Sequence, residues 1–141
     1  MIKNRWSDAE VKTYLSAAGQ NDADRDLALR VYTSRLIGQD PDLVMHGGGN
    51  TSVKIRRPDL FGEMGDVLHI KGSGWDLDTL EAPGLPGVWL APLHRLRYLD
   101  SLSDEDMVNA QRRNLLDSGA PNPSVETLLH AYLPHKFVDH T

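Results

Sequence analysis

The chain has 141 residues, of which 40% are hydrophobic and 25% charged, and its formal net charge is −5. This size and composition are typical of one soluble globular domain, and scattered basic residues with an acidic excess argue against nucleic acid as a partner. The chain has no cysteine, no apolar run near the roughly 20 residues of a membrane span and no signal-peptide core at its start, so we expect a cytoplasmic protein without disulfides or a membrane partner.

The first part of the chain predicts two helices. Ser7-Asp8-Ala9-Glu10 matches a capping box, and the helix it opens should reach about Ala18 before Gly19 ends it. Asn21 is a natural cap for a second helix that should end at Gly38. The apolar face of this second helix is predicted at Leu27, Val31, Leu36 and Ile37.

Strand patterns follow. Leu43–Met45 predicts a short strand, and the alternating Thr51–Arg56 predicts a second one. Val67, Leu68 and Ile70 predict a third strand, with His69 on the opposite face from its direct neighbours. Because short loops join these strands, we expect an antiparallel sheet.

The second half mixes loops with short elements. Residues 82–92 are rich in proline and glycine and predict a loop with a short strand at Val88–Leu90. Three helices are then predicted: Leu93–Leu99, Ser103 to about Leu116, and Ser124–Tyr132 with Ser124 as N-cap. A last strand is predicted at Phe137–Asp139. A domain rarely finishes inside a strand. We therefore expect residues 1–141 to be the N-terminal part of a domain cut from a longer chain, with a natural short final strand as the alternative.

Two glycine-rich loops are the clearest candidate site. Gly47–Ser52 and Lys71–Gly74 each follow an apolar stretch, and successive backbone N–H groups in such loops can converge on an anion. With the expected helix start at Ser124 they would form a phosphate cradle. The alternative is that both loops are only tight turns.

Three known glycine motifs are excluded. The chain has no G-x-x-x-x-G-K-[ST] loop, and its glycine run lacks the third glycine and the following helix of a dinucleotide fingerprint. His46-Gly47-Gly48-Gly49 matches a lipase oxyanion-hole tetrapeptide. That class requires a G-x-S-x-G elbow, and Gly72-Ser73-Gly74 does not have this spacing.

A carboxylate and several histidines gather near the end of the chain. Glu126 is followed by His130, His135 and His140, the residue types that hold a divalent metal beside a general base. Other readings stay open, because His130 can pair with Glu126 on a helix surface, His135 can be solvated, and His140 can be a partly buried strand residue.

Three stretches, HGGGNTSVK, HIKGSGWDL and PSVETLLHAYLPHKFVDHT, together resemble the class II aldolase/adducin family. Within it they most resemble the aldolase part of the bifunctional aldolase/short-chain dehydrogenase proteins, which is similar to rhamnulose-1-phosphate aldolase. The resemblance runs from about Asp26 to Thr141. It implies an α/β fold, a mixed but mainly antiparallel sheet flanked by helices, here truncated, and a homo-oligomer, a tetramer in the intact protein.

The resemblance also implies roles for single residues. Gly49 and Asn50, then Ser73 and Gly74, then Ser124 match the positions that bind the substrate phosphate, and Glu126 matches the catalytic glutamate. Val125 departs from the family pattern, which has a serine there, so one phosphate donor is lost. His140 matches the first of an H-x-H pair of zinc ligands, and the sequence ends before the second.

The activity implied for the intact protein is zinc-dependent, reversible cleavage of a ketose 1-phosphate to dihydroxyacetone phosphate and an aldehyde. A dehydrogenase domain downstream, if present, would use NAD. With one zinc ligand of three, residues 1–141 alone are expected to be inactive. Alternatives within the family are a sugar-phosphate epimerase, a dehydratase, or a non-enzymatic adducin-like binding module. Neither Lys71 nor His46 receives a role from the resemblance.

Overall fold

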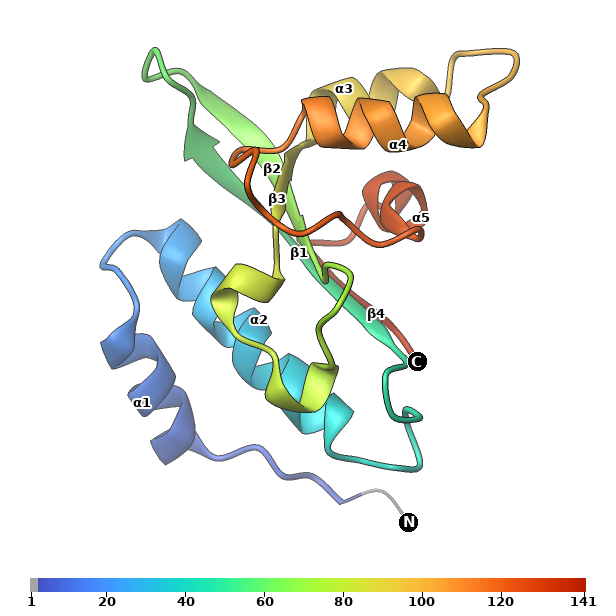
Figure 1. Cartoon of the computed structure of the whole chain (residues 1–141). Helices are drawn as coiled ribbons and strands as arrows, with labels where there is room; N and C mark the ends of the chain where they lie inside the picture. Colours follow the sequence, from blue (N-terminus) through green and yellow to red (C-terminus); the bar gives the residue numbers. More distant parts are fainter. Residues whose placement is uncertain (1–2) are drawn as a thin grey trace.

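Four antiparallel strands form one sheet in the computed structural model, which describes residues 3–141 (Figure 1). The strand order is β3-β2-β1-β4, so the central pair is a hairpin and the last strand joins it at the edge. This arrangement confirms the predicted α/β fold with an antiparallel sheet. The strands are β1 (Asn50–Pro58), β2 (Met64–Ile70), β3 (Gly87–Trp89) and β4 (Phe137–His140).

Side-chain caps begin three of the helices at the residues that the sequence predicts. Ser7 Oγ accepts from the Glu10 N–H at 3.3 Å. In the same way, Asn21 Oδ1 accepts from the Asp24 N–H at 2.8 Å, and Ser103 Oγ accepts from the Asp106 N–H at 3.1 Å. Each cap satisfies a backbone donor that the first helical turn leaves free. The helices are α1 (Asp8–Ala17), α2 (Asp22–Gly38), α3 (Leu90–Leu96), α4 (Asp104–Arg113) and α5 (Thr127–Tyr132), with short 3-10 turns η1 (Leu77–Thr79) and η2 (Ala82–Gly84).

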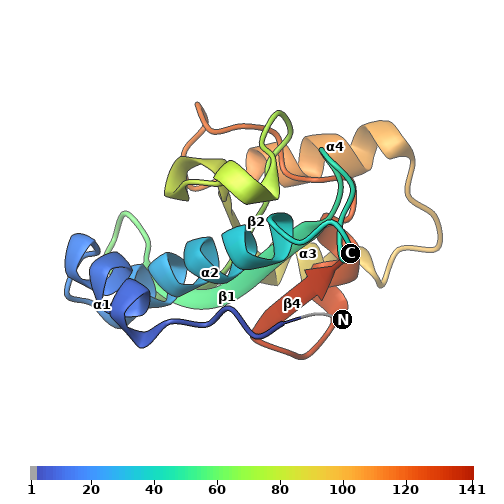
Figure 2. The same ribbon diagram turned by 90° about the horizontal axis from the view of Figure 1, so that it is seen from below.

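Helices cover both faces of the sheet. Figure 1 shows α1 and α2 on one side and α3, α4 and α5 on the other, and Figure 2 shows α2 running alongside β1. On the α2 face Val53, Ile55 and Val67 are buried against α2 and Trp89. On the other face Leu68 and Ile70 pack with side chains of β3, α3 and α5. Alternation along β1 and β2 therefore supplies two separate cores.

The strand predicted at Leu43–Met45 is wrong. The chain turns here, because the Leu43 and Val44 N–H groups both donate back to Asp40 O, at 3.0 and 3.2 Å, and Asp40 Oδ1 also accepts from the Asp42 N–H. An aspartate before a proline is a strong turn initiator, and it outweighs the apolar run.

Four helix bounds also differ from the prediction, among them the end of α3, which lies at Leu96 rather than Leu99. Helix α3 starts at Leu90 rather than Leu93, with Pro92 in the first turn, where a missing N–H is harmless. Helix α4 ends at Arg113 rather than near Leu116, because residues 114–116 pair with the outer edge of β3 through Trp89 N–H to Asn114 O and Leu116 N–H to Gly87 O.

Helix α5 starts at Thr127 rather than at Ser124. The Ser124 N–H donates to Lys71 O at 3.2 Å, and Glu126 is the N-cap residue without a capping side chain. Three N–H groups of the expected helix start are therefore already used: that of Ser124 by Lys71 O, that of Glu126 by Ser124 Oγ and that of Thr127 by Ser124 O.

Candidate functional site

The pairing of β1 with β4 brings distant site candidates together. Asn50 opens β1 and lies opposite His140, the last residue of β4. Both residues share a sheet face with Ser52, because side chains two positions apart in a strand point the same way. Helix α5 packs on that face, and Glu126 stands at its start.

Glu126 is the centre of a hydrogen-bonded cluster. Its Oε2 lies 2.5 Å from His140 Nδ1 and accepts from Asn50 Nδ2 at 3.3 Å. Asn50 Nδ2 also donates to Ser124 Oγ at 2.5 Å, and the same oxygen accepts from the Glu126 N–H at 3.1 Å. Four of the seven predicted site residues thus form one cluster that orients the Glu126 carboxylate.

Ser73 and Gly74 lie in the loop after β2, next to Ser124. The Ser73 N–H donates to Asn122 O at 2.9 Å, and Gly72 forms an isolated antiparallel bridge with Pro123. Two backbone donors of the expected phosphate cradle, those of Ser73 and Ser124, are therefore already used within the protein. Gly74 has φ +86° with open space around it.

Gly49 is enclosed by side chains. Its φ is +80°, and an added Cβ would come within 2.7 Å of both Leu77 Cδ1 and Val44 Cγ1. Neither the backbone conformation nor the space admits a larger residue. The backbone conformation and the packing therefore both favour glycine at this position, directly before Asn50 at the start of β1.

His130, on α5, is fully buried behind Glu126. Its Nδ1 lies 2.6 Å from Ser52 Oγ, whereas its Nε2 has no hydrogen-bond partner among residues 3–141. Burial lowers the pKa of His130, and the nearby Glu126 carboxylate opposes this only in part. Burial therefore favours the neutral ring. Its Nε2 carries either a lone pair or an N–H, and neither has a hydrogen-bond partner among the described residues.

Three of these side chains fit a divalent metal ion. One ligand atom each from Glu126, His130 and His140 lies within 4.8 Å of the other two. Imidazole and carboxylate are suitable ligands for zinc, and the unpartnered His130 Nε2 is the kind of atom that a bound ion would satisfy. His135 is exposed and His46 lies near Asp76, and neither belongs to this group.

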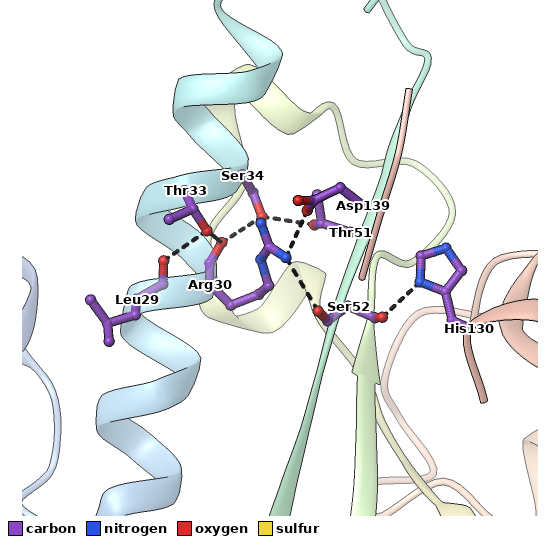
Figure 3. Close-up of polar contacts among 8 residues, drawn as sticks. All are labelled: Leu29, Arg30, Thr33, Ser34, Thr51, Ser52, His130 and Asp139. Atoms are coloured by element: carbon purple, nitrogen blue, oxygen red, sulfur yellow. Dashed lines mark hydrogen bonds and ion pairs between the residues drawn. The ribbon is translucent and has the colours of Figure 1, made fainter. Parts of the chain in front are cut away.

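An arginine on α2 supports the cluster from the opposite face of the sheet (Figure 3). Arg30 is only 2% exposed, and its Nη1 lies 2.7 Å from Asp139 Oδ1 and 3.3 Å from Ser52 O. Ser52 thus contacts Arg30 through its carbonyl and His130 through its hydroxyl, and Asp139 directly precedes His140. Sequence analysis placed Ser52 in the Gly47–Ser52 loop but did not predict its contact with His130, and it missed Arg30. The available signal for Arg30 was a charged residue beside Val31 on the apolar face of α2.

Within residues 3–141, the longest apolar helical stretch falls short of what a membrane crossing needs.

Comparisons with known proteins show the family and the fold of the chain. Residues 28–141 match the family model described as Class II Aldolase and Adducin N-terminal domain. The chain is 46% identical over 111 residues to Uncharacterized oxidoreductase YuxG from Bacillus subtilis (strain 168), an overlap of 79% of this chain and 16% of that protein. A solved structure, the N-terminal class II aldolase domain of a conserved protein from Thermoplasma acidophilum, is 40% identical with a TM-score of 0.81, over 99% of this chain and 60% of that one.

Proposed function

Because the chain belongs to the class II aldolase and adducin family, we propose that it serves the reversible aldol cleavage of a ketose 1-phosphate such as rhamnulose 1-phosphate. The products would be dihydroxyacetone phosphate and an aldehyde. One observation carries the proposal: the Glu126 carboxylate is held between His140 Nδ1 at 2.5 Å and Asn50 Nδ2 at 3.3 Å. A carboxylate oriented in this way can move a proton at a substrate carbon.

Glu126 would act on the carbon that loses the aldehyde. In cleavage, the carbon–carbon bond breaks, its electron pair passes into the enediolate of dihydroxyacetone phosphate, and the protonated Glu126 returns a proton to carbon. In the reverse direction the Glu126 carboxylate removes that proton. The hydroxyl proton lost as the aldehyde forms is assigned to no residue of this chain.

We propose that Glu126, His130 and His140 face a zinc ion. When bound, the ion would act as a Lewis acid that polarises the ketone and stabilises negative charge as the bond breaks. Ser52 Oγ, 2.6 Å from His130 Nδ1, would fix the orientation of that ring, as outer partners of metal-binding histidines do. Arg30 and Asp139 would fix the strand that presents His140.

The substrate phosphate is proposed to lie against Gly49, Asn50, Ser73, Gly74 and Ser124. Support comes from the short distances within this set, since Asn50 contacts Ser124 and the Ser73 loop is tied to the segment before α5. Holding the phosphate would place the reacting carbons near Glu126 and reduce the entropy cost of reaction.

The chain spans 16% of the curated relative and 60% of the solved chain that it matches, so the activity of a whole protein is a further proposal. We propose that residues 1–141 form the N-terminal part of an aldolase domain in a tetrameric cytoplasmic protein. The oxidoreductase name of the relative supports a fused dehydrogenase that would use NAD to oxidise the aldehyde.

The test measures release of dihydroxyacetone phosphate from rhamnulose 1-phosphate by the zinc-loaded polypeptide that carries this chain. Glu126→Gln should lower kcat by at least about a hundredfold, as expected when a general acid–base is removed. Glu63→Gln, an equal change at an exposed hairpin position, should leave kcat unchanged. The 141-residue chain alone should show little activity.

Three outcomes would contradict the aldolase proposal. Interconversion of pentulose phosphates without release of dihydroxyacetone phosphate would indicate an epimerase, and loss of water from the substrate a dehydratase. Absence of both turnover and zinc binding would indicate an adducin-like binding module.

A further inference from the structure

The end of the β1–β2 hairpin exposes large apolar side chains to water. Leu60 is 94% exposed, Phe61 is 85% exposed, and Met64, at the start of β2, is 52% exposed. These three residues are called the hairpin tip below. Figure 1 shows the hairpin reaching past the start of α2, at the end of the sheet opposite to the C-terminus. Because Asn50 and Glu126 lie at the other end of β1, the tip takes no part in the Glu126 cluster.

Other groups account for the shape of this turn. Asp59 Oδ1 accepts from the Phe61 N–H at 2.8 Å and from the Glu63 N–H at 2.9 Å. Gly62 supplies the left-handed backbone conformation, with φ +83°. The side chains of Leu60 and Phe61 are not needed for the turn, and small or polar residues usually stand at such positions. Clustered exposed apolar side chains are typical of a contact site.

A pocket elsewhere on the surface suits such a tip. It lies between α1, α2 and the η2 turn, has a volume of about 320 Å³, and is called the α1–α2 pocket below. An apolar cavity of about 150 Å³ already holds a benzene ring, so this pocket has room for the ring of Phe61. Most of its wall is apolar and consists of Tyr14, Ala17, Ala18, Gly19, Leu27, Ala28, Val31 and Ala82.

The charged groups of the wall are satisfied without the tip. Asp24 pairs with Arg57 at 2.9 Å. Arg35 donates through Nε and Nη1 to two uncharged oxygens of the same molecule, at 2.7 and 3.0 Å. Glu81 is exposed to water. An uncharged apolar tip can therefore enter the pocket without leaving a buried charge unpaired.

The tip and the pocket lie on the same side of the molecule. Asp24 belongs to the wall of the pocket, and its partner Arg57 belongs to the base of the hairpin. The tip does not fill this pocket in its own molecule, because Phe61 remains 85% exposed. A twofold axis between two copies would let each tip enter the pocket of the other copy, and such self-complementary contacts are the commonest in homo-oligomers.

The area of the contact also favours a mutual exchange. A large side chain buries up to roughly 200 Å², so one tip alone falls short of the roughly 800 Å² per partner that a stable interface buries. When both tips are exchanged, each copy buries its own tip and its own pocket, which brings the area per partner close to that value.

We propose that the hairpin tip binds the α1–α2 pocket of a second copy of this chain, with Phe61 as the anchor. The inference rests on the proposed function only for the expectation of a homo-oligomer, and not on the cleavage reaction. In the proposed tetramer, this contact would join the subunits in pairs.

The first test is sedimentation velocity of the 141-residue chain over a wide range of concentrations. Phe61→Ser should weaken self-association at least about tenfold, the loss expected when a buried phenylalanine is removed. Met45→Ser is the matched control, because Met45 is also 85% exposed but belongs to neither the tip nor the pocket. Ala28→Phe, which fills the pocket, should also weaken self-association, and its unfolding curve shows whether α2 remains folded.

Disulfide cross-linking tests which surface receives the tip. The chain has no cysteine of its own, so single cysteines can be introduced without side reactions. Under mild oxidation, a mixture of Phe61→Cys and Ala18→Cys chains of different mass should form a mixed disulfide dimer. A mixture of Phe61→Cys and Met45→Cys chains should not.

The inference is overturned by a parent chain that stays monomeric, by equal self-association of Phe61→Ser and Met45→Ser, or by absence of the cross-link between positions 61 and 18. Its failure is distinguishable from failure of the aldolase proposal. If the dimer depends on Phe61 but no ketose phosphate is cleaved, the contact stands and the aldolase proposal fails. If the ketose phosphate is cleaved and Phe61→Ser assembles as the parent does, the aldolase proposal stands and the contact is wrong.

Discussion

Gly49 and Gly62 differ in why the structure requires a glycine: at Gly62 only the backbone conformation does, and at Gly49 close packing does as well. Both have φ near +80°, but a Cβ on Gly49 would lie 2.7 Å from two side-chain carbons, whereas a Cβ on Gly62 meets nothing within 4 Å. Gly62→Ala should lower the free energy of unfolding by about 1 kcal/mol, because alanine disfavours the left-handed backbone conformation. Gly49→Ala adds overpacking and should cost about 3 kcal/mol, measured by urea unfolding. Equal losses would show that Leu77 and Val44 move aside freely.

His69 is predicted to make the protein acid-sensitive. It is buried on the α2 face, where its Nε2 accepts from Arg57 Nε at 3.0 Å and its Nδ1 lies 2.7 Å from Leu85 O. Burial, more than any other cause, lowers its pKa from 6.5 to about 4. The unfolded chain therefore binds a proton first, and stability present above pH 6.5 is lost as the pH falls towards 4, on the order of 3 kcal/mol in total.

The measurement compares unfolding free energies at pH 7.5 and 4.5 in the parent and in His69→Gln. Glutamine can still accept from Arg57 but does not titrate, so the variant should lose less stability on acidification than the parent. His135→Gln, at an exposed position, should behave as the parent does. Parallel pH dependence in the parent and His69→Gln would contradict the assignment.

At the residue scale, the sequence predicts those polar site residues that stand in a recognisable local motif. Glu126, Asn50 and His140 were predicted, and the structure brings them together. Arg30 was not predicted, because its partners Asp139 and Ser52 lie far away in the sequence. The role of a buried charge is defined by residues that only the fold brings near, and local patterns carry no information about them.

At the element scale, β4 is held by its backbone pairing with β1 and by one ion pair. It is a four-residue edge strand, and Asp139 pairs with the buried Arg30 at 2.7 Å. Asp139→Asn should reduce the unfolding free energy by about 2 kcal/mol, because the guanidinium remains buried with only a neutral partner. Since Asp139 precedes His140, zinc affinity should fall as well.

Asp66→Asn is the matched control for this change. Asp66 pairs with Arg56 at 3.6 Å, but both side chains are 65% exposed, and such surface pairs contribute little. Its unfolding free energy should match that of the parent within about 0.5 kcal/mol. If Asp139→Asn were equally harmless, β4 would be held by its backbone pairing with β1 and not by Arg30.

Elements with a clear local signal were predicted well, and those shaped by distant contacts were not. Capping residues located the starts of α1, α2 and α4, and alternation located β1 and β2. The end of α4 was predicted too late because residues 114–116 pair with β3. The start of α5 was predicted too early because a turn precedes the helix, in which Ser124 Oγ accepts from the Glu126 N–H and Ser124 O from the Thr127 N–H. The first error comes from tertiary hydrogen bonds that compete with the helix, and the second from local hydrogen bonds that form a turn before it.

At the scale of the whole molecule, zinc should stabilise the fold. An ion bound by His130 and His140, with the Glu126 carboxylate facing it, joins α5 to β4. A ligand that binds only the folded state stabilises it by about 2.7 kcal/mol at a hundredfold excess over Kd. The unfolding temperature should rise by roughly 5 to 10 °C. The same rise should persist in His135→Ala and disappear in His140→Ala. Loss of the effect in both variants, or in neither, would argue against this ligand set.

The sequence predicted the fold class but not the order of all strands in the sheet. Short loops predicted the antiparallel β1–β2 hairpin, and the structure confirms it. That β4 lies beside β1 rather than beside β3 could not be read from spacing, because nothing in four residues specifies a partner strand.

The strand order also implies a sequence of events during folding. The β1–β2 hairpin closes through a short loop, whereas the pairing of Asn50 with His140 joins positions separated by most of the chain. Contacts between distant positions form late, since closing a long loop is entropically costly. We expect the hairpin and its two cores to form first and β4 to dock last. The zinc ligands would then be assembled only in a nearly finished protein, so that metal uptake reports the completion of folding rather than initiating it.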